Sequence, residues 1–171
     1  MHQGCGAQTL RPGTEVFAVD SSRVIEVAYR SPALVLIAHR WEMGGKFTLV
    51  CLEKKQNRPS SCLAGPSFDL VLRQLTSLKL RRTLTARQAE DYWRKNPRPA
   101  WAEVVIRDHS ELEPFQALVR PMEGSPQEAV VRFNGATYIV ALDHQVFELI
   151  AGGCKTLGAG DESLGTRGKL P

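Results

Sequence analysis

Four cysteines are the residues of this 171-residue chain whose chemistry is easiest to anticipate: Cys5, Cys51, Cys62 and Cys154. Cys51 and Cys62 flank a short polar segment that brings its own ends together, so we predict a Cys51–Cys62 disulfide. Cys5 then pairs with Cys154 by elimination and ties the two ends of the domain. The alternatives are four reduced thiols or a zinc site. Zinc is the weaker alternative, because no two cysteines have the close C-x₂₋₄-C spacing of zinc ligands.

Three histidines, His39, His109 and His144, are the candidate acid–base groups of a hydrolase. Asp108-His109-Ser110 contains the three residue types of a catalytic triad, but triad members meet in space and not along the chain. The simpler interpretation is that Ser110 caps a helix. The sequence has no G-x-S-x-G, H-E-x-x-H or phosphate-loop motif. We therefore predict no catalytic, metal-binding or cofactor-binding residues, and keep a small hydrolase with a His–carboxylate site as an alternative.

Basic side chains are concentrated in residues 73–98, where eight lysines and arginines against two acidic residues give a charge of +6. Residues 101–150 have the opposite sign, with a sum of −5. A basic segment that contains Tyr92 and Trp93 is typical of nucleic-acid or polyanion binding. Both aromatic residues also fit the inward face of a helix, so this function is an alternative. We interpret the two opposed charge blocks as a surface dipole that orients a protein partner.

The composition is that of a folded globular protein, with 43% hydrophobic residues, 23% charged residues and a net charge of +4. These values exclude collagen, coiled coil and wholesale disorder. The longest apolar run, 33–38, is far shorter than the roughly 20 residues of a membrane-spanning helix. The N-terminus has no signal-peptide pattern. Disulfides are typical of exported proteins, so we expect a periplasmic or secreted protein whose leader has been removed, with a cytoplasmic location as the alternative.

Alternating apolar residues predict the strands that would position these groups. The predicted strands are 15–20, 23–30, 33–39, 46–53, 101–107, 129–133 and 136–142. Gly44-Gly45 and Asn134-Gly135 are hairpin turn signals between neighbouring strands. Residues 78–84 fit either a strand or the continuation of a helix. The pattern therefore predicts a meander of antiparallel strands.

Helical spacing alternates with these strands. The predicted helices are 67–78, 85–95 with a Thr85/Gln88 capping box, 111–118 with the same spacing at Ser110 and Glu113, and 143–150 with Asp143 as its cap. We expect one α+β domain over 15–154, with a mainly antiparallel sheet and two to three short helices. An N-terminal loop segment, 1–14, precedes it, and a flexible glycine-rich tail, 155–171, follows it. No internal repeat is evident.

A small α+β domain with predicted disulfides and no catalytic motif indicates a non-catalytic binding or inhibitor protein. By analogy of class alone, we expect a periplasmic immunity-type protein that blocks a secreted toxin or enzyme by loop insertion. The candidate loops are 41–46, 54–61 and 122–127. The residues expected in the contact are Trp41, Met43, Lys54, Lys55, Arg58, Met122 and Glu123, with the tryptophan and the methionines as apolar anchors.

Overall fold

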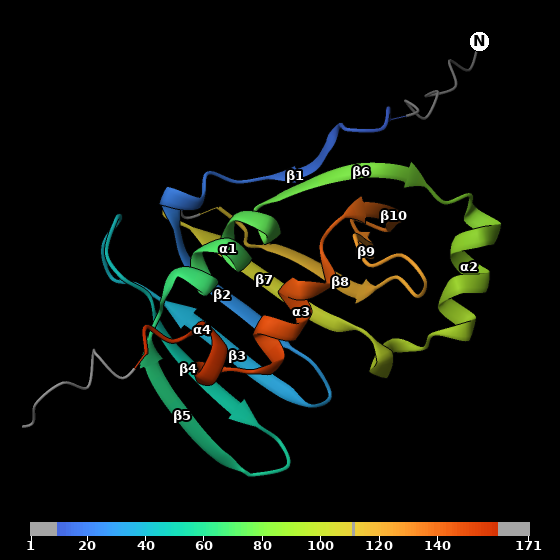
Figure 1. Cartoon of the computed structure of the whole chain (residues 1–171). Coiled ribbons are helices and arrows are strands. Elements are labelled where there is room, and N and C mark those ends of the chain that lie inside the picture. The colour runs from blue at the N-terminus through green and yellow to red at the C-terminus, as the bar shows by residue number, and fades with distance from the viewer. Residues whose placement is uncertain (1–9, 111, 161–171) are drawn as a thin grey trace, which may run out of the picture.

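The computed structural model describes residues 10–110 and 112–160, in which ten strands form a single antiparallel sheet (Figure 1). The strand order is β1-β6-β10-β9-β8-β7-β2-β3-β4-β5. The strands are β1 (Glu15–Ala18), β2 (Val24–Arg30), β3 (Leu34–His39), β4 (Thr48–Glu53), β5 (Arg58–Leu63), β6 (Ser77–Thr83), β7 (Ala102–Asp108), β8 (Phe115–Pro121), β9 (Glu128–Phe133) and β10 (Ala136–Ala141). The expected antiparallel sheet is confirmed.

Four α-helices accompany the sheet in the described residues: α1 (Pro66–Leu75), α2 (Ala86–Lys95), α3 (His144–Ala151) and α4 (Cys154–Leu157). Sheet outweighs helix, so the fold is mainly β and less evenly mixed than expected. None of the helices in the described ranges is long and apolar enough to cross a membrane.

Eight of the ten strands belong to two units with the same topology, each made of four consecutive antiparallel strands and a helix, and β6 and β1 extend the sheet beyond β10. The first unit is β2–β5 with α1, and the second is β7–β10 with α3. Their first strands pair antiparallel, with Val27 opposite Ile106, so a pseudo-two-fold axis passes between β2 and β7. After each helix the chain crosses to the outer strand of the other unit. β6 pairs with β10, and residues 157–159 run beside the end of β5.

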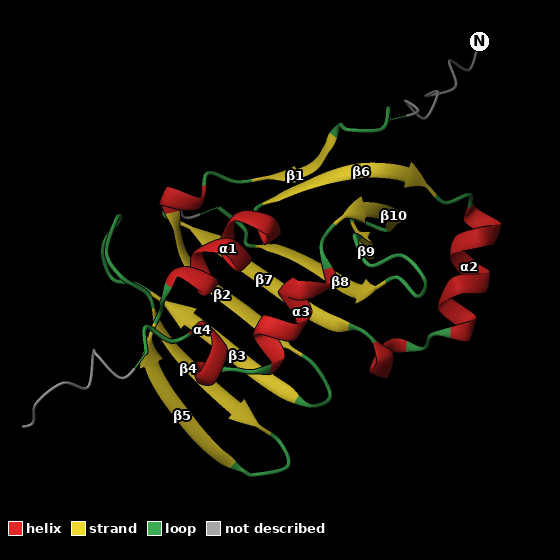
Figure 2. Ribbon diagram, viewed as in Figure 1, coloured by secondary structure: helices red, strands yellow, loops and turns green. Residues whose placement is uncertain are grey.

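One face of the sheet, the inner face, is covered by α1, α3 and α4 (Figure 2). The apolar positions of α1 are buried there at the helical spacing that the sequence predicts: Phe68, Val71, Leu72 and Leu75. The ring of Phe68 packs against that of Phe47, with centroids 5.1 Å apart. Asp143 accepts a hydrogen bond from the backbone N–H of Gln145 and begins α3, as predicted.

Among the described helices, α2 is the one that covers the opposite, outer face, and it lies over β8, β9 and β10. Tyr92 and Trp93 of this helix pack against a buried cluster of Trp101, Val130 and Ile139. The predicted capping box at Thr85 is present and begins α2. In the described ranges no helix covers the outer face of β3, β4 and β5, which is the equivalent part of the first unit.

The predicted helix over 111–118 is wrong, because strand β8 begins at Phe115. Asp108 accepts hydrogen bonds from the hydroxyl and the backbone N–H of Ser110, so this serine does not cap a helix. The buried residues Ala117 and Val119 alternate with more exposed ones, which is the period of a strand. The ambiguous segment 78–84 also forms a strand, β6.

The predicted loop over 54–61 shortens to a turn, because strand β5 begins at Arg58. Asn57 takes a left-handed conformation with φ of 48°, which closes the β4–β5 hairpin. Most of β5 is exposed at the edge of the sheet, so a strand forms there without the apolar alternation that signals one.

The folded part also extends beyond the predicted boundary at residue 154. Helix α4 occupies the start of the predicted tail and buries Leu157 completely. Ala159 still pairs with Leu63. Residues 161–171 of the predicted tail, and residues 1–9 of the predicted N-terminal segment, lie outside the described residues.

The outer edge of β5 is open along most of its length in the described residues. Near its end, Ala159 donates an N–H to the carbonyl of Leu63, and Gly65 donates to the carbonyl of Leu157. Backbone groups alternate along a strand, so the nitrogen of Pro59 faces this same open side. Proline has no N–H to donate, and it therefore weakens pairing of this edge with another chain.

Replacing Pro59 with valine is expected to cause concentration-dependent self-association, because the new N–H completes the row of edge donors. Sedimentation velocity over a series of protein concentrations measures the effect. Ser60→Val is the matched control, because the backbone of Ser60 faces β4 and the substitution adds no edge donor. If P59V sediments like the unaltered protein, Pro59 does not protect this edge.

Candidate protein-binding surface

Large apolar side chains are exposed mainly in one region of the described structure. Trp41 and Met43, in the β3–β4 loop, are 89% and 57% exposed. Val50 on β4 and Leu63 on β5 are 42% and 41% exposed. Leu112, in the β7–β8 loop, is the remaining exposed large apolar residue of the described ranges. Soluble proteins rarely leave such residues grouped together unless the surface binds something.

Strand register places several of these residues on the outer face of the sheet. Thr48 lies opposite both His39 and Leu63, so the three residues form a row across β3, β4 and β5. The ring of Trp41 makes an edge contact with the ring of His39, with centroids 4.6 Å apart. Val50 lies opposite Ile37 in the next row of the same face.

We call this surface the β3–β5 patch and define it by its apolar members: Val35, Ile37, Trp41, Val50, Leu52 and Leu63. Leu49 and Cys51 of β4 face the inner side and are buried, which fixes Val50 and Leu52 on the outer face. The patch is thus the outer face of the first unit, in the position that α2 covers on the second unit.

The β3–β4 loop that carries Trp41 is anchored at its base by Arg40. This guanidinium is buried, donates from Nε to the carbonyl of Val24 at 2.6 Å, and donates from Nη2 to the carbonyls of Ser21 and Ser22. It also lies 4.5 Å from the ring centroid of Phe47, at the other end of the loop. Burial lowers the pKa of Arg40. These contacts hold both ends of the loop and limit the entropy that binding would cost.

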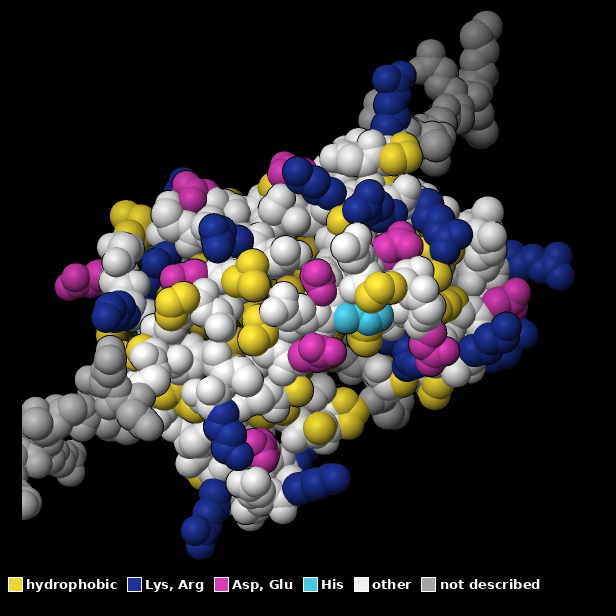
Figure 3. All heavy atoms as spheres, in the orientation of Figure 1, with side chains coloured by type: hydrophobic (Ala, Val, Ile, Leu, Met, Phe, Trp, Pro, Cys, Tyr) yellow, Lys and Arg dark blue, Asp and Glu magenta, His cyan; other side chains and the backbone are white. Residues whose placement is uncertain are grey.

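Basic side chains lie at the β4–β5 turn, beyond the end of the patch that lies away from Trp41. The register pairs Arg58 with Glu53, on the inward-facing side of the two strands. Lys54, Lys55 and Arg58 are all exposed, and none of them forms an ion pair within the described part of the chain. Lys and Arg side chains project at the lower tip of the molecule, over the β4–β5 hairpin (Figure 3). Two acidic residues of β2 and β7 lie on the outer face, and both are already paired. Glu26 is 3.5 Å from Arg107 and 3.8 Å from His39, and Glu103 is 3.5 Å from Arg30.

Two of the predicted contact residues lie elsewhere. Met122, in the β8–β9 loop, is half-buried and packs against the Trp101 cluster beneath α2. Glu123 pairs with Arg120 at 3.4 Å. Strands β2 and β7 separate this loop from the patch. The structure therefore places Trp41 on the patch, Met43 in the same loop, and Lys54 and Lys55 beyond the far end of the patch. Arg58 lies on the inward-facing side of the β4–β5 hairpin, and Met122 and Glu123 lie on another surface.

Sequence reasoning missed the residues that make this surface continuous. Val50 could have been found, because it alternates with the inward-facing Leu49 and Cys51. No sequence pattern indicates that Leu63 lies on a strand, since the segment before it is predicted to be a loop. Arg40 also had none, because a lone arginine after a strand usually faces solvent.

The structure pairs Cys62 with Cys154, with Cα atoms 5.9 Å apart, and leaves Cys51 as a buried thiol. The predicted Cys51–Cys62 bridge is therefore wrong. In the β4–β5 register Cys62 lies opposite Leu49, not opposite Cys51. The two cysteines are thus diagonal neighbours, about 7–8 Å apart in a typical sheet, which is too far for a disulfide. With Cys154 in this bridge, the predicted Cys5–Cys154 pair is wrong as well; Cys5 itself lies outside the described residues.

The three candidate histidines, His39, His109 and His144, lie apart from one another. His39 is on the outer face beside Glu26, and His109 is exposed after β7. His144 borders a cavity of about 550 Å³, where its Nε2 is 2.9 Å from the backbone carbonyl of Glu128. The hydrogen bonds from Ser110 lower the pKa of Asp108, the acidic member of the triad-like tripeptide. Within the described ranges no three His, Cys, Asp or Glu side chains gather as a metal site.

The basic segment 73–98 is spread over three elements. Lys79 and Arg81 are exposed on β6, whereas Tyr92 and Trp93 of α2 turn toward the sheet. The guanidinium of Arg132 already covers the ring of Trp93, at 4.4 Å from its centroid. The two aromatic residues are therefore engaged within the fold, and the segment offers basic charge without the stacking platform that single-stranded nucleic acid uses.

No protein-family model, curated protein or solved structure matches the chain. The functional argument therefore depends on the geometry of the β3–β5 patch and its surroundings.

Proposed function

We propose that the protein is a non-catalytic binding domain that receives an amphipathic helix of a partner protein on the β3–β5 patch. The observation that carries the proposal is the unequal covering of one sheet. On the second unit, α2 covers the outer face of β8–β10 with Tyr92 and Trp93. On the first unit the equivalent face has no helix in the described residues, and Val50 and Leu63 remain exposed.

The helix that would suit this surface has an apolar, aromatic face and acidic flanks. The apolar face matches the patch, as Trp93 matches the cluster beneath α2. Acidic flanks would complement Lys54 and Lys55, which have no ion-pair partner in the described part of the chain. Trp41 supplies an exposed anchor at the opposite end, on a loop that Arg40 and Phe47 hold in place.

Inhibition of a secreted partner is the finer form of this proposal. A domain bound beside the active site of a toxin or enzyme would block it, as expected of an immunity-type protein. The Cys62–Cys154 bridge supports export to the periplasm or beyond, since disulfides persist in oxidising compartments.

A peptide based on α2 tests the proposal directly. The probe is a synthetic peptide of residues 84–97, cross-linked to hold its helix, in which Arg87, Arg94 and Lys95 are replaced by glutamate. The full chain is titrated with this peptide. Calorimetry measures the binding, and NMR chemical-shift mapping is expected to locate it on the patch. Val50→Asp is expected to weaken it at least about tenfold, because the helix would bury an unpaired carboxylate. Added salt should weaken it too.

Leu112→Asp is the matched control, because it also replaces an exposed apolar residue by aspartate, at a position in the β7–β8 loop. This variant should bind the peptide like the unaltered chain. Failure of the acidic peptide to bind, or shifts that map away from β3–β5, would refute the proposal. Dimerisation of the chain that V50D abolishes would also refute it, because the occupant of the patch would then be a second copy.

A further inference from the structure

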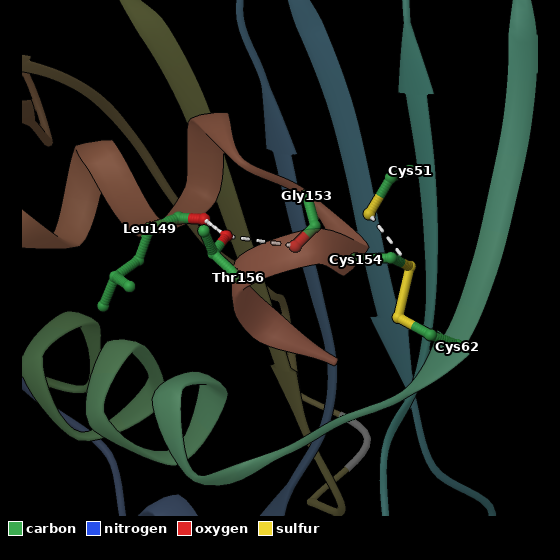
Figure 4. Close-up of a disulfide and its surroundings, with 6 residues drawn as sticks. All are labelled: Cys51, Cys62, Leu149, Gly153, Cys154 and Thr156. Carbon is green, nitrogen blue, oxygen red and sulfur yellow. Dashed lines mark hydrogen bonds between the residues drawn. A yellow bond between two sulfur atoms is a disulfide. The ribbon is translucent and has the colours of Figure 1, made fainter. Parts of the chain in front are cut away.

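Three sulfur atoms from different elements meet beneath the β4–β5 hairpin. Cys51 lies on β4, Cys62 on β5 and Cys154 at the start of α4 (Figure 4). The Sγ atom of Cys51 is 3.8 Å from that of Cys154, which is already bonded to Cys62. Figure 4 shows the Sγ atom of Cys154 between the other two. A thiol is therefore in contact with one sulfur of a disulfide, which is the arrangement that thiol–disulfide exchange requires.

Glycines at both ends of α4 allow this approach. Gly153 has φ of 56°, and a side-chain carbon there would lie 3.4 Å from the sulfur of Cys51. A side-chain carbon at Gly158 would lie 3.2 Å from the sulfur of Cys62 and 2.6 Å from the carbonyl oxygen of Cys154. The two glycines thus let α4 lie close enough to the sheet for Cys154 to reach both strands.

We propose that Cys51, Cys62 and Cys154 form an internal disulfide-exchange site, in which Cys51 replaces Cys62 as the partner of Cys154. The thiolate of Cys51 attacks the Sγ atom of Cys154 and forms a new S–S bond. The Cys62–Cys154 bond breaks, and its electron pair leaves on the sulfur of Cys62, which takes up the proton that Cys51 gave up. One disulfide is exchanged for another, so no external oxidant or reductant is consumed.

The two bridges have different consequences for the surface. With Cys62–Cys154, the remaining thiol is Cys51, which is only 2% exposed and shielded from reagents. With Cys51–Cys154, α4 is tied to β4, and the half-buried Cys62 on the edge strand becomes the thiol. Exchange therefore converts a shielded thiol into an accessible one while α4 stays attached to the sheet.

The buried position of Cys51 limits the rate of the exchange. Burial raises the pKa of this thiol, so little of it is thiolate near neutral pH. Because the thiolate is the attacking species, the exchange rate should rise with pH through and beyond the usual range of cysteine ionisation.

Alkylation of the folded full chain tests the exchange. Cys5→Ser removes the remaining cysteine, and iodoacetamide is added without denaturant at several pH values. Peptide mapping under non-reducing conditions then locates the label and the bridge. The expected product carries its label at Cys62 and a bridge between Cys51 and Cys154, and it forms faster as pH rises. A label at Cys51 with the Cys62–Cys154 bridge retained, or no label at all, would overturn the proposal.

Two further variants in the same background separate exchange from adventitious reduction. In Cys51→Ser the internal nucleophile is gone, so Cys62 should remain unlabelled; labelling there would show that another agent opens the bridge and would contradict the exchange. In Cys62→Ser the two remaining cysteines should form a Cys51–Cys154 bridge in air. If both stay reduced in a folded chain, the second bridge does not form and the proposal fails.

Discussion

Truncating Phe68 to alanine is expected to lower the free energy of unfolding by about 3–5 kcal/mol, the cost typical of removing a buried phenylalanine. Phe68 has no exposed surface and lies on α1, where its ring packs against Phe47 between the helix and the sheet. Its removal opens a cavity that the surrounding strands can fill only in part. Unfolding in guanidinium chloride, monitored by circular dichroism, measures the loss.

Leu70→Ala is the control for this variant, because Leu70 lies on the same helix but is only half-buried and outside the core cluster. Its cost should stay below about 1 kcal/mol, as for substitutions away from the core. Equal costs for the two variants would mean that α1 does not bury Phe68 against the sheet.

Replacing Cys154 with serine is expected to lower the free energy of unfolding by about 2–5 kcal/mol, as for loss of other native disulfides. The Cys62–Cys154 bridge joins residues 92 positions apart, so its loss returns considerable freedom to the unfolded chain. Cys154 is the residue to replace because both alternative bridges need it. Denaturant unfolding under non-reducing conditions measures the change.

A reductant provides the control for the disulfide variant. The unaltered chain under reducing conditions should unfold at nearly the same denaturant concentration as C154S, and the reductant should leave C154S unaffected. If the unaltered, oxidised chain is no more stable than C154S, the bridge contributes nothing to the fold.

Local signals predicted those elements whose residues satisfy their own backbone or form a periodic face. The Asn134-Gly135 turn has positive φ at both residues, 49° and 76°, as the hairpin that the sequence predicts requires. The capping box at Thr85 and the apolar spacing from Phe68 are likewise present. In each case the information lies within a few neighbouring residues.

Features that depend on which strand lies beside which could not be predicted in this way. β5 has no apolar alternation because it is an edge strand. The capping-box spacing at Ser110 predicts a helix where β8 forms, but Ser110 does not cap a helix. The disulfide pairing depends on the register that sets Cys62 opposite Leu49. Chain spacing carries no information about that register.

The same distinction between local signals and distant contacts explains why only part of the candidate surface could be predicted. Trp41 and Met43 follow a strand and precede two glycines, and both are exposed, as a turn position indicates. Their role in binding stays a prediction. Met122 has the same kind of position, yet it packs beneath α2, whose docking on β9 and β10 depends on contacts between distant segments.

The pseudo-two-fold arrangement has an evolutionary consequence. Two identical four-stranded units, each ending in a helix and paired through their first strands, would form a closed symmetric homodimer with the strand order β5 to β2 and then β7 to β10. Duplication and fusion of one gene would produce the present chain, with β6 and α2 as the join. In such an ancestor any helix on one outer face must also lie on the other. Fusion removes that constraint, so the two faces can diverge, and one can lose its cover and acquire a ligand.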